Sequence, residues 1–156
     1  MYEWLLFFHV LAAFCYVGAY VWFTAVIVAG RRSDSPARAA ALFGAVRWGN
    51  VLAAIGGVGT IALGIWLAIY VDGYELWDGW ILASLVLWAI TAELGRREGA
   101  EYNRAGALAA ELRSQGATAS PELNAALRTR TGLLYHVLGS IAVLVILWLM
   151  IYKPGT

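Results

Sequence analysis

The chain has 156 residues, of which 62% are hydrophobic and only 13% are charged, and its formal net charge is +1. A water-soluble domain usually carries about 25% charged residues, so this composition excludes an ordinary soluble enzyme or binding domain. The small net charge also provides no general basic field that would attract nucleic acid. The composition therefore predicts one membrane domain, residues 1–156, whose main partner is the lipid bilayer and which does not bind nucleic acid.

The first apolar run covers residues 4–29 and contains no charged residue. Crossing the hydrocarbon takes about 20 apolar residues, so the run is long enough to span a membrane. It is too long for a secretory signal, whose apolar core has roughly 7–15 residues, and Glu3 precedes it where a signal peptide would be basic. We therefore expect a first transmembrane helix. It contains the single cysteine, Cys15, so the chain has no disulfide framework.

The second apolar run, residues 48–71, carries small residues at helical spacing. Gly56, Thr60 and Gly64 are each four residues apart, which places them on one face of the expected helix. Ser35-Pro36 is typical of an N-cap and first helical residue, so this helix is expected to begin well before its span. The stripe predicts close helix packing, either against a sister helix or at an oligomer interface.

The third apolar run, residues 77–95, continues into an amphipathic segment. Apolar residues recur every three or four positions from Tyr102 to Leu112, which predicts one helix that runs to Gln115 and is ended by Gly116. Ser120-Pro121 predicts the start of a helix that leads into the fourth span, residues 132–152. Residues 96–131 are therefore expected to form a helical hairpin outside the membrane.

Basic residues gather on one side of these four spans. Ten of the eleven Lys and Arg residues lie between runs one and two or between runs three and four, and the other side holds only Lys153 with four acidic residues. Basic connections resist translocation and stay in the cytoplasm. We therefore expect an all-α, up-down-up-down bundle of four transmembrane helices with cytoplasmic helical extensions. It would sit in a bacterial inner membrane with both termini outside.

Two histidines, His9 and His136, are the ionisable residues that lie clearly inside the expected spans. Neutral imidazole is a common ligand of haem iron, so His9 is a candidate ligand of haem b and His136 a weaker one. The helix directions separate them by about 15 Å along the membrane normal, which is too far for one iron. Either His9 pairs with its copy in a second protomer, or each histidine bonds to a neighbouring helix.

Four further residues are candidates for a site. Tyr16 and Tyr20 share the helix face of His9, and such an aromatic stripe either lines a cofactor or packs against another helix. Arg47 and Glu93 lie at the inner boundary of spans two and three, where we expect an ion pair; the alternative is a vestibule for protons or an anion. Phosphate loops, CxxC and HExxH are absent, so no catalytic residue is assigned and an enzyme is not the preferred class.

Three segments of the chain are distinctive together: YEWLLFFH at residues 2–9, SPEL at residues 120–123 and LMIYKPG at residues 149–155. With the glycine-containing second span, they resemble an uncharacterised bacterial integral membrane family, domain of unknown function 2269. The resemblance covers nearly the whole chain and implies four spans in a bundle. A more distant likeness, which rests on His9 and its setting, is to four-helix membrane modules of the copper-resistance D and cytochrome b type, in which span histidines bind haem.

Two classes of function follow from these observations. The first is a redox or haem-b module with His9 as a ligand. The second is a non-redox membrane protein, either a scaffold or accessory subunit or a pathway for a small solute or ion. Both are compatible with a homo-oligomer or with a subunit of a larger membrane complex. No span contains proline, which argues against a transporter built on broken helices.

Overall fold

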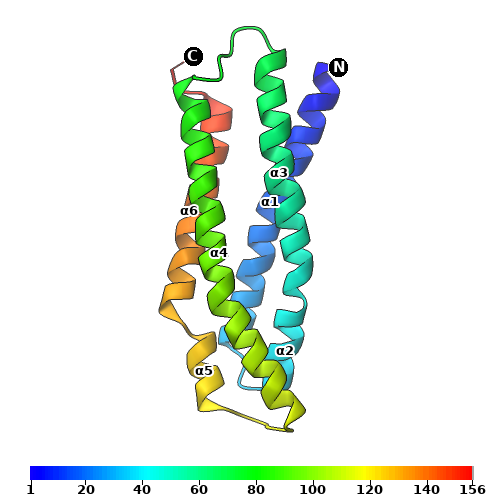
Figure 1. The fold of residues 1–156 in the computed structure, drawn as a ribbon, viewed down its shortest axis with the longest axis vertical. Helices are drawn as coiled ribbons and strands as arrows, with labels where there is room; N and C mark the ends of the chain where they lie inside the picture. Colours follow the sequence, from blue (N-terminus) through cyan, green and yellow to red (C-terminus); the bar gives the residue numbers. More distant parts are fainter. Residues whose placement is uncertain (156) are drawn as a thin grey trace.

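Residues 1–155 are described by a computed structural model, in which they form four long antiparallel helical rods (Figure 1). Each rod is long and apolar enough to cross a membrane. The predicted all-α bundle with four candidate spans is therefore confirmed. The helices are α1 (Tyr2–Arg31), α2 (Pro36–Gly44), α3 (Val46–Tyr70), α4 (Gly79–Ser114), α5 (Pro121–Leu127) and α6 (Arg130–Tyr152).

Both termini lie at one end of the bundle, beside the loop between α3 and α4 (Figure 1). At this end Lys153 Nζ donates to the Tyr74 hydroxyl at 2.6 Å, which ties the end of α6 to that loop. The opposite end contains α2, α5 and the last turns of α4 (Figure 1). We call it the arginine-rich end because ten arginines lie in residues 31–47 and 96–130.

The two expected continuous helices from Pro36 and Pro121 are each interrupted. Ala45 separates α2 from α3, and the pair Arg128 and Thr129 separates α5 from α6. Thr129 is extended (φ −49°, ψ 128°), and its side chain accepts from the N–H of Gly132. The prediction of one helix was therefore wrong here because Thr129 starts a new helix with its own cap.

Glycines allow α1 and α3 to pack closely. A Cβ at Gly56 would meet the backbone nitrogen of Tyr16, and a Cβ at Gly64 would lie 3.0 Å from Cε1 of His9. Both glycines therefore face α1, so the stripe of Gly56, Thr60 and Gly64 packs against a sister helix. Small residues permit such an approach where lipid is as apolar as the side chains.

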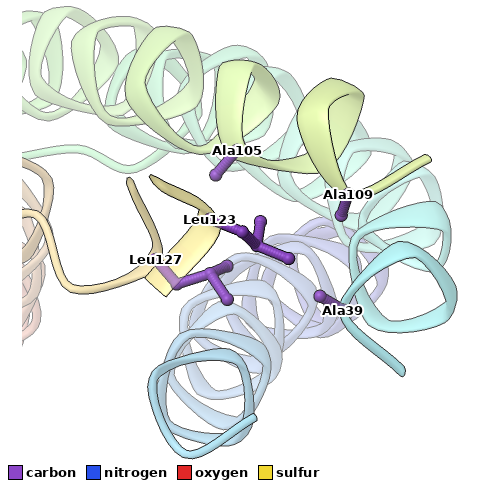
Figure 2. Packing of buried hydrophobic residues seen from close by; sticks show 5 residues of the cluster. All are labelled: Ala39, Ala105, Ala109, Leu123 and Leu127. Carbon is purple, nitrogen blue, oxygen red and sulfur yellow. The ribbon is translucent and has the colours of Figure 1, made fainter. Parts of the chain in front are cut away.

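The cluster of best-buried apolar side chains lies at the arginine-rich end. Leu123 and Leu127 of α5 point into a space between α2 and α4 that is lined by alanines (Figure 2). The alanines have no side chain beyond Cβ, so the helices approach closely around the two leucines. In the apolar spans, by contrast, many large side chains are exposed on the outside, as suits lipid. The cluster consists of Ala39, Ala105, Ala109, Leu123 and Leu127.

The helices associate in two pairs. α1 packs along α3 and α4 packs along α6, whereas the backbones of α3 and α4 lie farther apart and the Trp88 side chain of α4 reaches Gly57 of α3. The pairs are joined mainly at the arginine-rich end, where α2 contacts α4. Toward the end that holds the termini, the ribbons of α3 and α4 are separated (Figure 1).

Candidate functional site

A cleft of about 310 Å³ lies between α1, α3 and α4 in the half of the bundle nearer the arginine-rich end. Its walls are mostly apolar. α3 and α4 form two of its walls. Six aromatic rings belong to its lining: Tyr16, Tyr20, Phe23, Phe43, Trp88 and Tyr102.

One face of α4 forms a continuous wall of the cleft. Trp88, Thr91, Gly95, Glu98 and Tyr102 follow one another at three- or four-residue spacing and all belong to the lining. This spacing places side chains on one side of an α-helix. Glu98 is the single acidic or basic residue among the lining residues. The cleft therefore combines apolar and aromatic walls with one carboxylate.

Glu98 is bonded to His136 of α6. Its Oε1 lies 3.0 Å from His136 Nδ1, and the two residues are only 8% and 4% exposed. His136 Nε2 lies 2.8 Å from Oγ1 of Thr24 on α1, and the Tyr20 ring stacks on the imidazole. A hydrogen-bonded chain therefore joins α4, α6 and α1. Both ring nitrogens of His136 have partners, which leaves neither free for iron.

Tyr16 and Tyr20, both predicted site residues, lie in the cleft wall with ring centroids 5.5 Å apart. The Tyr16 hydroxyl is 2.9 Å from Thr91 Oγ1, which itself donates to the Trp88 carbonyl at 2.8 Å. Tyr16 therefore donates to Thr91. The indole N–H of Trp88 is buried without a partner in the part of the chain that the structure describes.

His9 lies away from this cleft. It precedes Tyr20 by eleven residues on α1, a rise of about 16 Å, and does not belong to the cleft lining. Its ring packs against Gly64, and its Nδ1 is buried without a hydrogen-bond partner among residues 1–155. Because Tyr20 stacks on His136, the two histidines stand at different depths, as the helix directions predict.

The predicted ion pair between Arg47 and Glu93 is wrong. Glu93 pairs with Arg96 at 2.8 Å and with Arg97 at 2.7 Å, both on α4. Arg47 instead places its guanidinium over the ring of Trp48, 5.1 Å from the centroid. Arginines three and four residues along the same helix are nearer partners for Glu93 than a residue on another helix. The pairing therefore does not link spans two and three.

Sequence reasoning does not single out Glu98, because the residue falls within the helical hairpin that is expected outside the membrane. It precedes Tyr102, Ala105 and Ala109 by four, seven and eleven residues, so it shares the buried face of α4 with them. That spacing is the signal that could have identified it. Thr24 carried no comparable signal, because a threonine in an apolar span is common.

A family model described as "Predicted integral membrane protein (DUF2269)" matches residues 3–154, which is nearly the whole chain. The description agrees with the four candidate spans. No curated protein and no solved structure matches the chain.

Proposed function

We propose that this chain, which belongs to the DUF2269 family of predicted integral membrane proteins, is a non-redox membrane protein that binds a small amphiphilic molecule in the cleft between α3 and α4. The cleft itself carries the proposal. Small-molecule sites of about 300–1,000 Å³ combine apolar and aromatic walls with a few convergent polar groups. Aromatic side chains surround this cleft, and Glu98, Asn50 and Asn103 are polar residues of its lining. This is the small-solute alternative of the sequence analysis.

The orientation of the protein determines where the ligand enters. We place the arginine-rich end in the cytoplasm and both termini outside a bacterial inner membrane, because basic connections resist translocation. The cleft then lies in the inner half of the bilayer and extends to the cytoplasmic interface near Asn103. We expect a molecule that partitions into the inner leaflet to enter this cleft laterally, between α3 and α4.

Filling the cleft tests this function. Gly95 lines the cleft, and a Cβ there would meet no atom within 4 Å, so Gly95→Phe adds a ring to the space without moving the backbone. Gly18→Phe is the matched control, because Gly18 is equally unobstructed and is not part of the lining. An uncharged photoreactive probe, a 4-alkylbenzophenone, is crosslinked to the protein in lipid nanodiscs, and the labelled residues are mapped by mass spectrometry.

We expect labels to concentrate on residues 50–58 and 88–103 in the wild type and in Gly18→Phe. Labelling of these segments should fall at least several-fold in Gly95→Phe. Labels that simply follow lipid exposure, and that are unchanged in Gly95→Phe, would contradict a binding cleft.

A haem-b site at His9 is the second candidate function, and one observation favours it. The His9 Nδ1 is buried without a partner in the described chain, and an unsatisfied polar group inside a membrane is costly. The fit is incomplete, because the ring packs against Gly64 and the cleft does not reach it. A second protomer would have to supply the other wall, which would make the protein a homo-oligomer.

Absorption spectra distinguish a haem-binding protein from one that binds no haem. Protein expressed with adequate haem supply is purified in detergent and measured oxidised and after dithionite reduction. A haem site at His9 predicts a Soret band that His9→Ala abolishes and His136→Ala retains. A colourless wild-type protein removes the haem candidate and leaves the cleft unaffected.

A further inference from the structure

The Thr24 hydroxyl has one hydrogen but two acceptors within reach. Its oxygen lies 2.8 Å from the carbonyl oxygen of Tyr20 and 2.8 Å from Nε2 of His136. A hydroxyl donates one hydrogen and accepts through its lone pairs. The direction in which Thr24 donates therefore decides which nitrogen of His136 carries a hydrogen.

The two directions in which Thr24 can donate correspond to different numbers of protons on Glu98 and His136. If Thr24 donates to the Tyr20 carbonyl, Nε2–H of His136 donates to Thr24. The hydrogen bond of 3.0 Å between His136 Nδ1 and Glu98 then requires a second proton, because one of the two atoms must donate. This proton lies either on the Glu98 carboxyl group or on the His136 ring. If Thr24 donates to Nε2 instead, Nδ1–H donates to an ionised Glu98. The first arrangement holds one proton more than the second.

The first arrangement is neutral. The second has a net charge of −1, which is carried by the Glu98 carboxylate. Glu98 and His136 are both buried, and burial disfavours an uncompensated charge. In the first arrangement the extra proton compensates the carboxylate. A positive charge placed beside Glu98 in the cleft can take the place of that proton, because it stabilises the ionised carboxylate.

We propose that the cleft ligand is a lipophilic organic cation and that it exchanges for the proton held between Glu98 and His136. The proposal rests on the binding function of the cleft described above. Aromatic faces attract cations, and rings of Tyr16 and Trp88 line the same space as Glu98. One cation enters, one proton leaves to solvent, and Thr24 turns its hydrogen from the Tyr20 carbonyl to His136. The net charge of the site stays at zero.

The other ionisable groups around this pair come from α1 and α4. Tyr20 stacks on the imidazole, and Tyr102 follows Glu98 by four residues on the buried face of α4. Arg31 of α1 donates to the carbonyl of Thr129 at 3.0 Å, and the Thr129 hydroxyl lies 3.5 Å from a carboxylate oxygen of Glu101. Tyrosine and arginine ordinarily keep their protons between about pH 5 and 9, and Glu101 is not in the cleft lining. α3 contributes no ionisable side chain to the lining.

Two probes of nearly equal shape test the exchange. Methyltriphenylphosphonium is a lipophilic cation without a titratable proton, and triphenylphosphine oxide is its uncharged counterpart. Calorimetric titrations in buffers of different ionisation enthalpy give the number of protons released per bound probe. We expect about one proton per cation and none for the oxide. The cation affinity should rise with pH over the range in which the empty site holds the extra proton, because binding releases that proton.

Glu98→Gln should remove the proton release and the pH dependence and weaken cation binding at least tenfold. Retained binding of triphenylphosphine oxide shows that the cleft of this variant is intact. Glu93→Gln is the matched control, because this carboxylate lies on the same helix outside the lining, and it should bind the cation like the wild type.

Cation binding without proton release overturns the exchange. Binding of the oxide alone also overturns it but leaves the binding function of the cleft in place. If neither probe binds and the benzophenone labels show no preference for the cleft, the binding function fails as well.

Discussion

Gly56 lies where the backbones of α1 and α3 approach each other. A Cβ at this position would meet the backbone nitrogen of Tyr16 and would lie 2.8 Å from the carbonyl oxygen of Ala12. Backbone atoms cannot rotate aside as a flexible side chain can, so the two helices would have to separate. Gly18 of α1 has no atom within 4 Å of its Cβ position and provides the opposite case.

Gly56→Ala is therefore expected to destabilise the protein by about 1–3 kcal/mol, as overpacking does. Gly18→Ala should be neutral or stabilising by about 0.5–1 kcal/mol, because alanine is the better helix former. Unfolding in detergent, followed by circular dichroism, measures both changes. Equal stability of the two variants would show that α1 and α3 do not need the close approach.

Glu98 and Glu93 are two carboxylates of one helix with different surroundings. Glu98 is buried against His136, whereas Glu93 is half-exposed beside Arg96 and Arg97. Removing a buried partner leaves the other group unsatisfied, so Glu98→Ala should cost about 1–3 kcal/mol. Glu93→Ala should have no measurable effect, because exposed ion pairs contribute little. The same unfolding experiment compares them, and a larger effect at Glu93 would contradict the burial of Glu98.

These residues also show where sequence reasoning stops. The composition of span four marks His136 as unusual, but nothing in the chain assigns it Glu98, which is 38 residues away, as its partner. The same limit applies to Arg47 and Glu93, which were paired because both lie near the inner boundary. Which charges meet depends on helix rotation, and apolar spans of nearly uniform hydrophobicity do not reveal rotation.

At the scale of elements, the two Ser-Pro pairs differ although their sequences predict the same cap. The Ser120 hydroxyl accepts from the N–H of Leu123 at 3.2 Å. Ser35 makes no side-chain cap bond, and its carbonyl accepts from the Ser33 hydroxyl at 3.3 Å. Proline sets the backbone angle of the first turn in both helices, whereas the serine rotamer depends on the neighbouring chain.

Ser120→Ala should therefore cost about 1 kcal/mol, the usual effect of losing an N-cap, and Ser35→Ala much less. The loss would fray α5 and loosen Leu123 and Leu127 in their cluster. Hydrogen–deuterium exchange over residues 121–127 should become faster in Ser120→Ala, while exchange over residues 36–44 in Ser35→Ala should stay near that of the wild type. Similar changes in both segments would mean that the two caps are equivalent.

The elements themselves are largely predictable. Apolar runs of sufficient length predict all four spans, and the spacing from Tyr102 to Leu112 predicts the extension of α4. Gly116 follows the end of this helix with φ +73°, a conformation that favours glycine. The break at Thr129 was not predicted, because the apolar pattern continues on both sides of it. Tertiary contacts show what stabilises the break: the carbonyl of Thr129 accepts from Arg31 of α1, and Arg128 donates to the carbonyl of Arg31.

The whole molecule combines two kinds of packing. Small residues bring α1 and α3 together in the apolar spans, whereas the leucine and alanine cluster joins α2, α4 and α5 at the arginine-rich end. Burial of apolar side chains is favourable where the alternative is water and gives little advantage where the alternative is lipid. The location of this cluster therefore agrees with an arginine-rich end that projects from the membrane.

The side of the membrane on which the arginine-rich end lies can be measured directly. On a Cys15→Ala background, Asp72→Cys places a thiol in the loop between α3 and α4, and Thr118→Cys places one between α4 and α5; both sites are exposed. Ten arginines lie at the same end of the bundle as Thr118, whereas Lys153 is the basic residue at the end of Asp72. Since basic connections resist translocation, we expect the arginine-rich end to stay on the cytoplasmic side. A membrane-impermeant maleimide should label Asp72→Cys in intact cells and Thr118→Cys only after permeabilisation. The reverse pattern would move the cleft to the outer leaflet, and its proton would then exchange with the outside.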